Sequence, residues 1–275
     1  MLEINFDLSQ FDSVELVPLA DVHIGNPLCD EAEFKKMVDY ILEEPKDPTC
    51  ARICLLNGDL TESATKTNRN GNVFEQIYTP SVQVAMMINY LRPLTETSKK
   101  YPQGKILSYC AGNHDSDRYK ETGISASESI AVGLGLQDRY SVNGCYSFIR
   151  MKSPKEGNLV HTVYNTHMTG GSTTVGGKAN RIAKISNGVV ADLIIGSHVH
   201  LPLTFKEDIL VPFNGLTLVQ QTITYLITNA FLKYGDYAQK MSLKPATIST
   251  PRVLLKSYRE GSGQRRVRRY TEVIL

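Results

Sequence analysis

The sequence predicts an α/β fold that contains a largely parallel sheet. Five short runs are apolar almost throughout and rich in β-formers, which is typical of strands buried on both faces. They cover residues 14–20, 52–57, 105–111, 160–166 and 191–196. Amphipathic helical patterns separate the first three runs, so the first half reads strand–helix–strand–helix–strand. That order implies right-handed crossovers between parallel strands.

The helical patterns carry their own start signals. Residues 31–43 place apolar side chains on one stripe, and Asp30 and Glu33 have the spacing of a capping box. Residues 80–91 begin with Pro80, and Thr79 before it is a candidate N-cap. A pattern interrupted by two glycines predicts a third helix over 126–136, and a fourth is predicted over 178–186.

The second half of the chain is richer in strands. It ends in two predicted strands, 252–258 and 266–274, joined by the turn 260–263. Residues 61–78 are polar without period and 169–177 are rich in Gly and Thr, so both are predicted loops. No linker or internal repeat interrupts the chain, and its length suits one large core. We therefore expect a single domain over 1–275.

Composition excludes several classes of protein. The chain has 275 residues, 41% of them apolar and 21% charged, with a formal charge of +2, which rules out disorder and a coiled coil. No apolar run approaches the ~20 residues of a membrane-spanning helix, and the N-terminus lacks a signal-peptide pattern. The five cysteines form no CxxC pair, which argues against a disulfide framework or a zinc knuckle. A cytoplasmic protein without a membrane span is expected.

The C-terminal segment 250–275 is basic, with seven Lys or Arg residues against two acidic ones. A basic segment on a mildly acidic body can attract a polyanion. The alternative is a solvated hairpin that carries its charges outward to protect an edge strand. The sequence leaves both interpretations open.

Each of the five predicted strands ends in polar side chains that suit a metal ion. Ligands of open α/β sheets bind beyond the carboxyl ends of the strands, so these ends would gather in one crevice. The motifs are Asp21-Val22-His23, Gly58-Asp59, Gly112-Asn113-His114-Asp115, His167 and His198-Val199-His200. In an extended chain the two i, i+2 pairs would each project to one side.

Taken singly, each motif also has an ordinary reading as a turn, a cap or a half-exposed strand. The joint pattern is more informative, because five of the six histidines fall at these strand ends. The sixth, His161, begins the fourth strand and is predicted to have no chemical role. The full set therefore predicts a metal site.

This ordered set, D-x-H, G-D, G-N-H-D, H and H-x-H, resembles that of the calcineurin-like metallophosphoesterases. It is most similar to the subgroup that contains the Mre-type DNA-repair nucleases and the cyclic-nucleotide phosphodiesterases. The motifs extend from Asp21 to His200, about two thirds of the chain. The resemblance implies a four-layer αββα sandwich, in which two mixed β-sheets pack face to face with helices outside.

The resemblance also implies two metal positions that share Asp59 as a bridging carboxylate. The first position would have the ligands Asp21, His23, Asp59 and His200. The second would have the ligands Asp59, Asn113, His167 and His198. His114 would lie beside the metals without binding them, oriented by Asp115.

The chain departs from the family pattern in two places. The last motif reads G-S-H-V-H where G-H-x-H is usual, so Ser197 is an insertion that leaves the local turn open. Gly58-Asp59 is followed by Leu-Thr-Glu-Ser, without the Asp-Arg-Gly extension of the protein Ser/Thr phosphatases. The second departure weighs against a phosphoprotein phosphatase.

The predicted ligands define a reaction. Two carboxylates against two divalent ions leave a charge of about +2, which suits a hydroxide and a phosphate. A bridging hydroxide would attack phosphorus in line, and His114 would act as general acid with Asp115 holding its tautomer. Imidazole, carboxylate and amide ligands without thiolate suit Mn²⁺, Fe or Zn²⁺, and Mn²⁺ is expected because nuclease-like relatives use it.

The substrate is less determined than the reaction. A phosphodiesterase acting on DNA or another nucleic acid is the first hypothesis, with nucleic acid contacted by Arg118, Lys178, Arg181, Arg265 and Arg266. Arg118 could instead be a solvated cation paired with Asp117. The alternatives are a small-molecule phosphoesterase, for a cyclic nucleotide or a phosphomonoester, and a non-catalytic scaffold. Scaffold relatives have typically lost several ligands, whereas all seven positions are filled here. Partner proteins, cleavage polarity and a possible homo-oligomer stay open.

Overall fold

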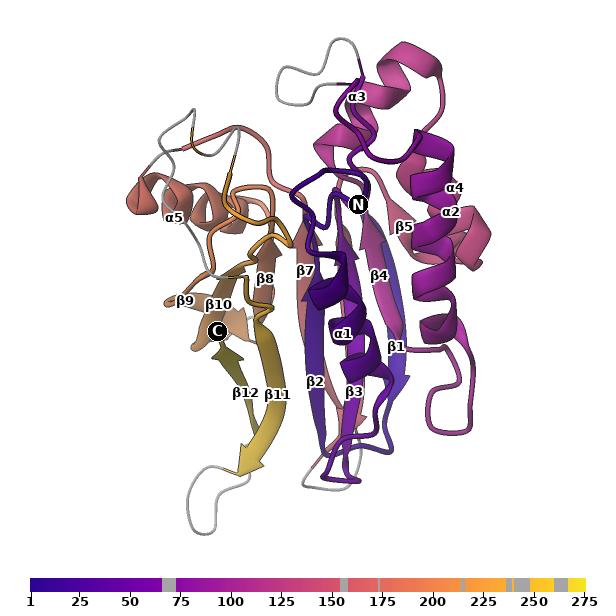
Figure 1. Cartoon of the computed structure of the whole chain (residues 1–275). Helices are drawn as coiled ribbons and strands as arrows, with labels where there is room; N and C mark the ends of the chain where they lie inside the picture. Colours follow the sequence, from indigo (N-terminus) through magenta and orange to yellow (C-terminus); the bar gives the residue numbers. More distant parts are fainter. Residues whose placement is uncertain are drawn as a thin grey trace.

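The computed structural model describes residues 1–65, 73–153, 158–172, 174–213, 216–235, 239, 248–259 and 267–275. Within this part the strands form two six-stranded sheets (Figure 1). Sheet I has the order β12-β11-β2-β3-β4-β5, and sheet II has the order β1-β6-β7-β8-β10-β9.

Sheet I contains the parallel strands that the sequence predicts. Its strands are β2 (Ser13–Leu19), β3 (Cys50–Asn57), β4 (Ile106–Cys110), β5 (Tyr140–Ser141), β11 (Arg252–Arg259) and β12 (Val267–Ile274). β2, β3, β4 and β5 pair in parallel, whereas β11 pairs antiparallel with both β2 and β12. The sheet is therefore mixed, and the predicted C-terminal hairpin forms its edge.

Sheet II is also mixed. Its strands are β1 (Leu2–Leu8), β6 (Cys145–Lys152), β7 (Asn158–Thr166), β8 (Leu193–Gly196), β9 (Leu203–Phe213) and β10 (Thr217–Ile227). β8 pairs in parallel with β7 and β10, and β1 pairs in parallel with β6. The pairs β6–β7 and β9–β10 are antiparallel hairpins.

Helices cover the outer face of each sheet (Figure 1). The helices on sheet I are α1 (Glu31–Leu42), α2 (Pro80–Leu91) and α4 (Ala126–Leu134), and α5 (Val175–Ala183) lies on sheet II. Phe34, Met87 and Ile130 belong to the apolar core beneath the helices of sheet I, and Leu16 and Val163 to the core between the sheets. The predicted four-layer sandwich of two mixed sheets flanked by helices is thus confirmed.

Several elements escaped the sequence prediction for physical reasons. β1 alternates between buried and exposed side chains and so lacks a continuous apolar run. Helix α3 (Asn113–Thr122) buries only His114 and Asp115, so it has no apolar stripe, and it ends at Gly123, whose φ is 68°. The helix predicted over 178–186 begins earlier, at Val175, because Thr174 caps it by accepting from Gly177 N.

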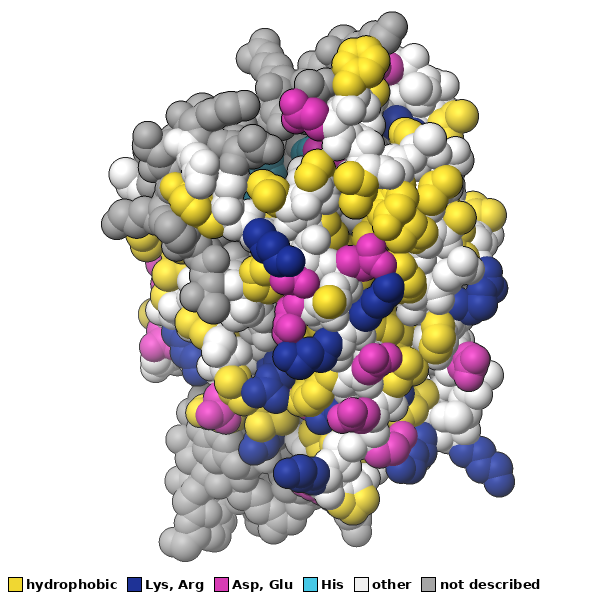
Figure 2. Space-filling model, viewed as in Figure 1, with side chains coloured by type: hydrophobic (Ala, Val, Ile, Leu, Met, Phe, Trp, Pro, Cys, Tyr) yellow, Lys and Arg dark blue, Asp and Glu magenta, His cyan; other side chains and the backbone are white. Residues whose placement is uncertain are grey.

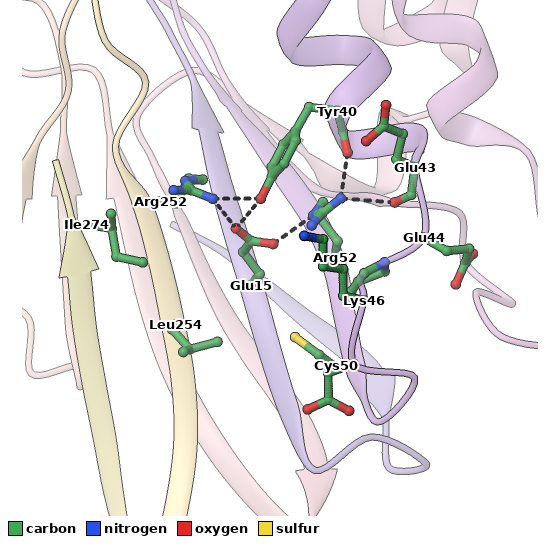
Figure 3. A pocket seen from close by; sticks show the side chains of 12 residues that line it. Glu15, Tyr40, Glu43, Glu44, Lys46, Cys50, Arg52, Arg252, Leu254 and Ile274 are labelled. Atoms are coloured by element: carbon green, nitrogen blue, oxygen red, sulfur yellow. Dashed lines mark hydrogen bonds and ion pairs between the residues drawn. The ribbon is translucent and has the colours of Figure 1, made fainter.

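A pocket of about 480 Å³ opens beside α1 on the outer face of sheet I (Figure 3). Arg252 donates to the Tyr40 hydroxyl (2.7 Å) and to Glu15 (3.2 Å), and Arg52 donates to Glu15 from the other side (2.7 Å). This half-buried network ties β11 to β2 and α1. Arg252, one of the basic residues of 250–275, is therefore part of the packing, and no predicted metal ligand lines this pocket.

All five cysteines are free thiols, as the lack of a pairing motif predicts. No helix in the described part of the chain combines the length and the apolar character needed to cross a membrane. On the face drawn in Figure 2, basic and acidic side chains are interspersed, and histidine side chains are visible in a recess near the top.

Candidate metal centre

The predicted ligands come together just beyond the carboxyl ends of strands from both sheets. β2, β3 and β4 of sheet I lead to Asp21, Asp59 and Asn113, each one to three residues after the strand ends. β7 of sheet II leads to His167, and β8 leads to the pair His198 and His200. Each sheet thus supplies one half of the site.

The first proposed metal position contains Asp21, His23 and His200, whose ligand atoms lie within 4.8 Å of one another. His200 Nε2 is 3.2 Å from Asp21 Oδ1, and the other oxygen of Asp21 accepts from His198 N at 3.0 Å. Asp21 and His23 are buried, whereas 36% of the His200 side chain is exposed. The recess therefore opens to solvent on the His200 side.

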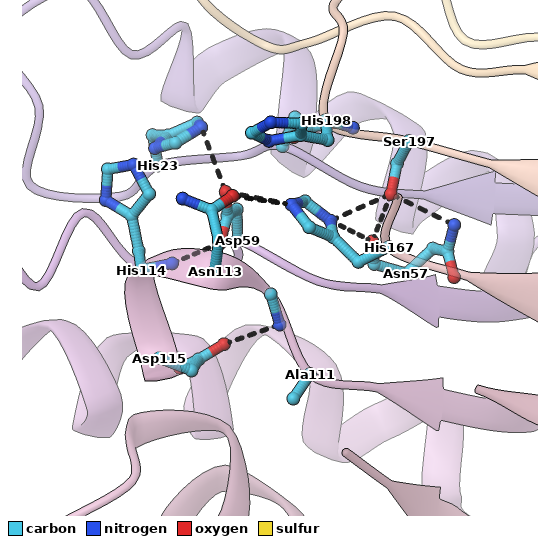
Figure 4. A network of polar contacts seen from close by, with 12 residues as sticks. His23, Asn57, Asp59, Ala111, Asn113, His114, Asp115, His167, Ser197 and His198 are labelled. Atoms are coloured by element: carbon cyan, nitrogen blue, oxygen red, sulfur yellow. Dashed lines mark hydrogen bonds and ion pairs between the residues drawn. The ribbon is translucent and has the colours of Figure 1, made fainter. Parts of the chain in front are cut away.

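The second position contains Asp59, His167 and His198, again within 4.8 Å. Asp59 Oδ2 lies 3.1 Å from His167 Nε2 and 4.0 Å from His23 Nε2, so this one oxygen stands between the two positions (Figure 4). That placement is the one a bridging carboxylate requires.

The Asn113 amide also faces this position. Its Oδ1 lies 3.0 Å from His167 Nε2, and the same terminal atom is 2.8 Å from His198 Nδ1 and 3.0 Å from Asp59 Oδ2. Carboxylate oxygens and unprotonated ring nitrogens are acceptors, so without a cation the amide nitrogen would belong on this side. With its oxygen turned to this side, Asn113 could serve as a ligand of a positive ion together with Asp59, His167 and His198.

The donor set fits a pair of divalent ions. His23 Nδ1 donates to Glu62 Oε2 at 3.0 Å, which leaves Nε2 unprotonated in the neutral ring. His23 Nε2 is buried and has no hydrogen-bond partner. A buried polar atom without a partner costs roughly 1–3 kcal/mol, and a metal ion would satisfy it. Imidazole, carboxylate and amide oxygen are ligands that Mn²⁺, Fe and Zn²⁺ accept.

The backbone around the ligands differs from the extended conformation expected for the i, i+2 pairs. Five of the seven ligand residues have positive φ, between 47° and 81°: Asp21, His23, Asp59, His198 and His200. β2 ends at Leu19 and β8 at Gly196, so both pairs lie in turns after the strands. The strand-alternation argument was therefore wrong, although the side chains do converge.

Gly112 allows these turns to approach closely. A Cβ on Gly112 would overlap both the carboxylate and the main-chain nitrogen of Asp59. The main-chain nitrogen of His114, two residues later, donates to Asp59 Oδ1 at 3.0 Å. The start of α3 therefore packs directly against the shared carboxylate.

His114 is buried next to the first metal position. Its ring lies 4.7 Å from the ring of His23, and one of its nitrogens is within 4.8 Å of ligand atoms of His23 and Asp59. Its Nδ1 donates to the main-chain oxygen of Glu62 at 2.7 Å. His114 therefore lies beside the first proposed position, where it could also reach an ion, so its catalytic role and its exclusion from the ligands stay predictions.

The prediction that Asp115 orients the His114 ring is wrong. The two Asp115 oxygens accept from Gly112 N (3.0 Å) and Ser127 N (2.9 Å), and the side chain points away from the imidazole (Figure 4). Asp115 sits in the first turn of α3, where a carboxylate bends back to cap the helix. The partner that fixes the imidazole is Glu62, which the sequence analysis did not single out.

Charges within the site pull the pKa values of its groups apart. Burial opposes ionisation of Asp59, but the charges of His167 and His114 hold its pKa well below the usual value. Burial likewise disfavours the charged form of His167, yet Asp59 raises the pKa of His167 to about 9. Burial and the neighbouring His167 lower the pKa of His198 to about 4. The site is strongly polarised around Asp59.

The residues predicted to bind substrate have varied surroundings. Arg118 donates to Ser63 Oγ at 3.4 Å near the site, whereas Asp117 pairs with Lys120 instead of Arg118. Lys178 donates to Val199 O at 2.8 Å, between the two ligand histidines. Arg181 donates to the main-chain oxygens of residues 169 and 171. Arg265 and Arg266 lie outside the described residues.

The comparisons with known proteins are distant. No family model and no curated protein matches this sequence. A conserved uncharacterised protein of Streptococcus pneumoniae TIGR4, described as a predicted phosphoesterase, is 9% identical with a TM-score of 0.36. That match covers 94% of this chain and 98% of the other. Vps29 of Chaetomium thermophilum is 12% identical with a TM-score of 0.35, over 96% and 97% of the two chains. The case for function rests on the site.

Proposed function

We propose that this protein is a dinuclear-metal phosphoesterase of the calcineurin-like metallophosphoesterase family that hydrolyses phosphodiester bonds in nucleic acid. The observation that carries the proposal is the position of Asp59 Oδ2, between His23 Nε2 at 4.0 Å and His167 Nε2 at 3.1 Å. A carboxylate shared by two clusters of imidazole ligands is the geometry of a two-metal site.

The residues of the site have separate roles in the proposed reaction. A pair of divalent ions supplies a nucleophilic water of lowered pKa and neutralises phosphate charge. Asp59 holds the two halves of the site together, while Glu62 and the main chain of Asn57 keep the ligand histidines in their metal-binding tautomers.

His114 serves as the general acid. Burial opposes its charging, but Asp59 and Glu62 raise the pKa of His114 above its usual value, which favours the protonated form that a general acid needs. Its Nδ1 is held by Glu62 O, which directs the other ring nitrogen away from that bond and towards the leaving group. The His114 ring lies 4.7 Å from the His23 ring, at the edge of the proposed metal positions.

The charge of the basic segment 250–275 motivates a polymeric substrate. β11 runs antiparallel to β2, so Arg259 at the end of β11 lies at the edge of sheet I opposite Asp21. Eight residues along β2 and three along β11 separate them, roughly 35 Å at ~3.3 Å per residue. This is about one turn of duplex DNA. Only a polymer can contact both the metal centre and this segment.

A small-molecule phosphodiester is the second candidate. Lys178 and Arg181 donate to main-chain oxygens of the ligand loops, so they are less available for substrate than predicted. Arg118 is then the described cation from the predicted set that remains near the site, which suits one phosphate as well as a chain of them.

The test uses Mn²⁺-loaded protein and four substrates: bis(4-nitrophenyl) phosphate, 4-nitrophenyl phosphate, cyclic AMP, and labelled DNA of 6 and 20 base pairs. We expect hydrolysis of the nitrophenyl diester and of the 20-base-pair DNA. In the Arg265→Ala/Arg266→Ala variant, binding of the longer DNA should weaken and become less dependent on salt, with hydrolysis of the nitrophenyl diester unaffected. Preference for the monoester, or for cyclic AMP with no cleavage of DNA, would reject the nucleic-acid assignment.

A further inference from the structure

A ladder of four buried polar side chains crosses the core directly beneath the metal centre. Ser108 Oγ donates to Asn165 Oδ1 (2.8 Å), Asn165 Nδ2 donates to Asn57 Oδ1 (2.9 Å), and Asn57 Nδ2 donates to Ser197 Oγ (3.0 Å). All four residues have no exposed surface. They lie at the end of an otherwise apolar core, where a polar network is costly unless it is fully bonded.

The ladder alternates between the sheets. Ser108 is on β4 and Asn57 on β3, both in sheet I, whereas Asn165 is on β7 and Ser197 follows β8 in sheet II. Each of its three bonds therefore joins one sheet to the other. This matters for the site because each metal position draws ligands from both sheets.

The end of the ladder formed by Asn57 and Ser197 contacts His167, a predicted metal ligand (Figure 4). His167 Nδ1 lies 2.8 Å from Asn57 O, to which it donates, and 2.8 Å from Ser197 Oγ. The Ser197 hydroxyl donates to the same Asn57 oxygen at 2.6 Å. Because these contacts engage Nδ1, Nε2 is the nitrogen of His167 that faces Asp59 and Asn113, and it is the one that would bind a metal ion.

Ser197 is the residue at which the sequence departs from the family pattern. It adds no strained turn of its own, since it is not among the described residues with positive φ, and it is fully buried. Its hydroxyl occupies a place that a glycine would leave without a donor or acceptor for Asn57.

We propose that Ser197, Asn57, Asn165 and Ser108 are positioning residues that set the spacing of the two half-sites and hold His167 in its metal-binding tautomer. The proposal rests on the two-metal function and names the part of the protein on which affinity at the second position depends. A purely structural network would act on stability alone, whereas this one acts on the metal.

The test compares two deletions of a buried serine hydroxyl. Ser197→Ala removes the hydroxyl that contacts His167, and Ser147→Ala removes one on β6 of the same sheet that is equally buried and has no hydrogen-bond partner. Mn²⁺ is titrated calorimetrically into chelator-stripped protein, and thermal unfolding of the metal-free forms is measured in parallel. The binding phase that disappears in His167→Ala identifies the second position.

We expect Ser197→Ala to weaken the second phase by about 10- to 100-fold, the usual effect of removing an outer partner of a ligand, with Ser147→Ala within twofold of wild type. Equal dissociation constants in the two serine variants would overturn the proposal. If Ser197→Ala does not fold, Ser108→Ala at the far end of the ladder decides: weakening of the same phase supports the proposal, and no change refutes it. Wild-type protein that binds no pair of Mn²⁺ ions would instead refute the proposed function itself.

Discussion

Replacing Gly112 with alanine should disable both metal positions through one methyl group. The backbone of Gly112 has φ −100° and ψ 178°, which alanine adopts freely, so the change introduces no backbone strain. The new Cβ would overlap the carboxylate and main-chain nitrogen of Asp59, which must move by about 1 Å to relieve the contact. A misplacement of that size costs roughly 10²-fold in rate, or about 2.7 kcal/mol of transition-state stabilisation.

The assay is hydrolysis of bis(4-nitrophenyl) phosphate with Mn²⁺, together with the metal content of the dialysed protein. Gly176→Ala is the matched control, because a Cβ there meets nothing within 4 Å and lies on helix α5. It should leave the rate unchanged and raise stability by about 0.4–1 kcal/mol through a less flexible unfolded chain. A Gly112→Ala protein with two bound metals and a wild-type rate would show that Asp59 is not the shared ligand.

Three further predictions test the acid, a buried histidine and the metals. His114→Asn should lower turnover by about 10²- to 10⁴-fold while both metals stay bound; loss of metal would mean that His114 is itself a ligand. Burial lowers the pKa of His161 to about 4, so the unfolded chain takes up a proton below pH ~6.5 that the folded chain refuses. His161 should thus contribute up to about 3 kcal/mol to the stability that the metal-free protein loses between pH 7 and pH 4. Urea unfolding of His161→Leu should therefore show a loss smaller than that of wild type by this amount. Exhaustive chelation should abolish activity and lower the melting temperature, and Mn²⁺ should restore both; full activity after chelation would end the two-metal proposal.

The parts of the fold that the sequence could predict are those whose burial is either continuous or repeats with a regular period. β3 is buried at every position and reads as a continuous apolar run, and α1 repeats its apolar residues on one stripe. β1 and the hairpin β9–β10 are half exposed, so their patterns are diluted. Helix α3 is held by its ends and its contact with Asp59, which no local pattern reveals.

At the candidate site, too, some residues carry a clear sequence signal and others carry none. The residues that converge at the candidate site were recognisable in the sequence because histidines and aspartates follow its buried strands in a regular order. Residues that act through another group gave no such signal, since Glu62 and Asn57 look like ordinary loop and strand residues in sequence. Ser197 was visible only as a departure from a pattern. Asp115 follows His114 in the sequence but is not its hydrogen-bond partner. The carboxylate of Asp115 lies in the first turn of α3 and bends back to accept from the main chain of Gly112.

The backbone of the ligand turns links metal binding to stability. Five ligand residues hold positive φ, and Asp and His are among the residue types that tolerate this region, at about 1–2 kcal/mol each. The sum, roughly 5–10 kcal/mol, is comparable with the whole stability of a typical domain. The surrounding strands, Gly112 and the ladder under His167 must therefore hold turns that would relax if left alone. Ions bound at the proposed positions would offset this strain, because they would interact with the strained arrangement and not with the unfolded chain. We therefore expect metal binding to stabilise the protein, since the turns already hold their side chains in the arrangement that two ions about one carboxylate would require.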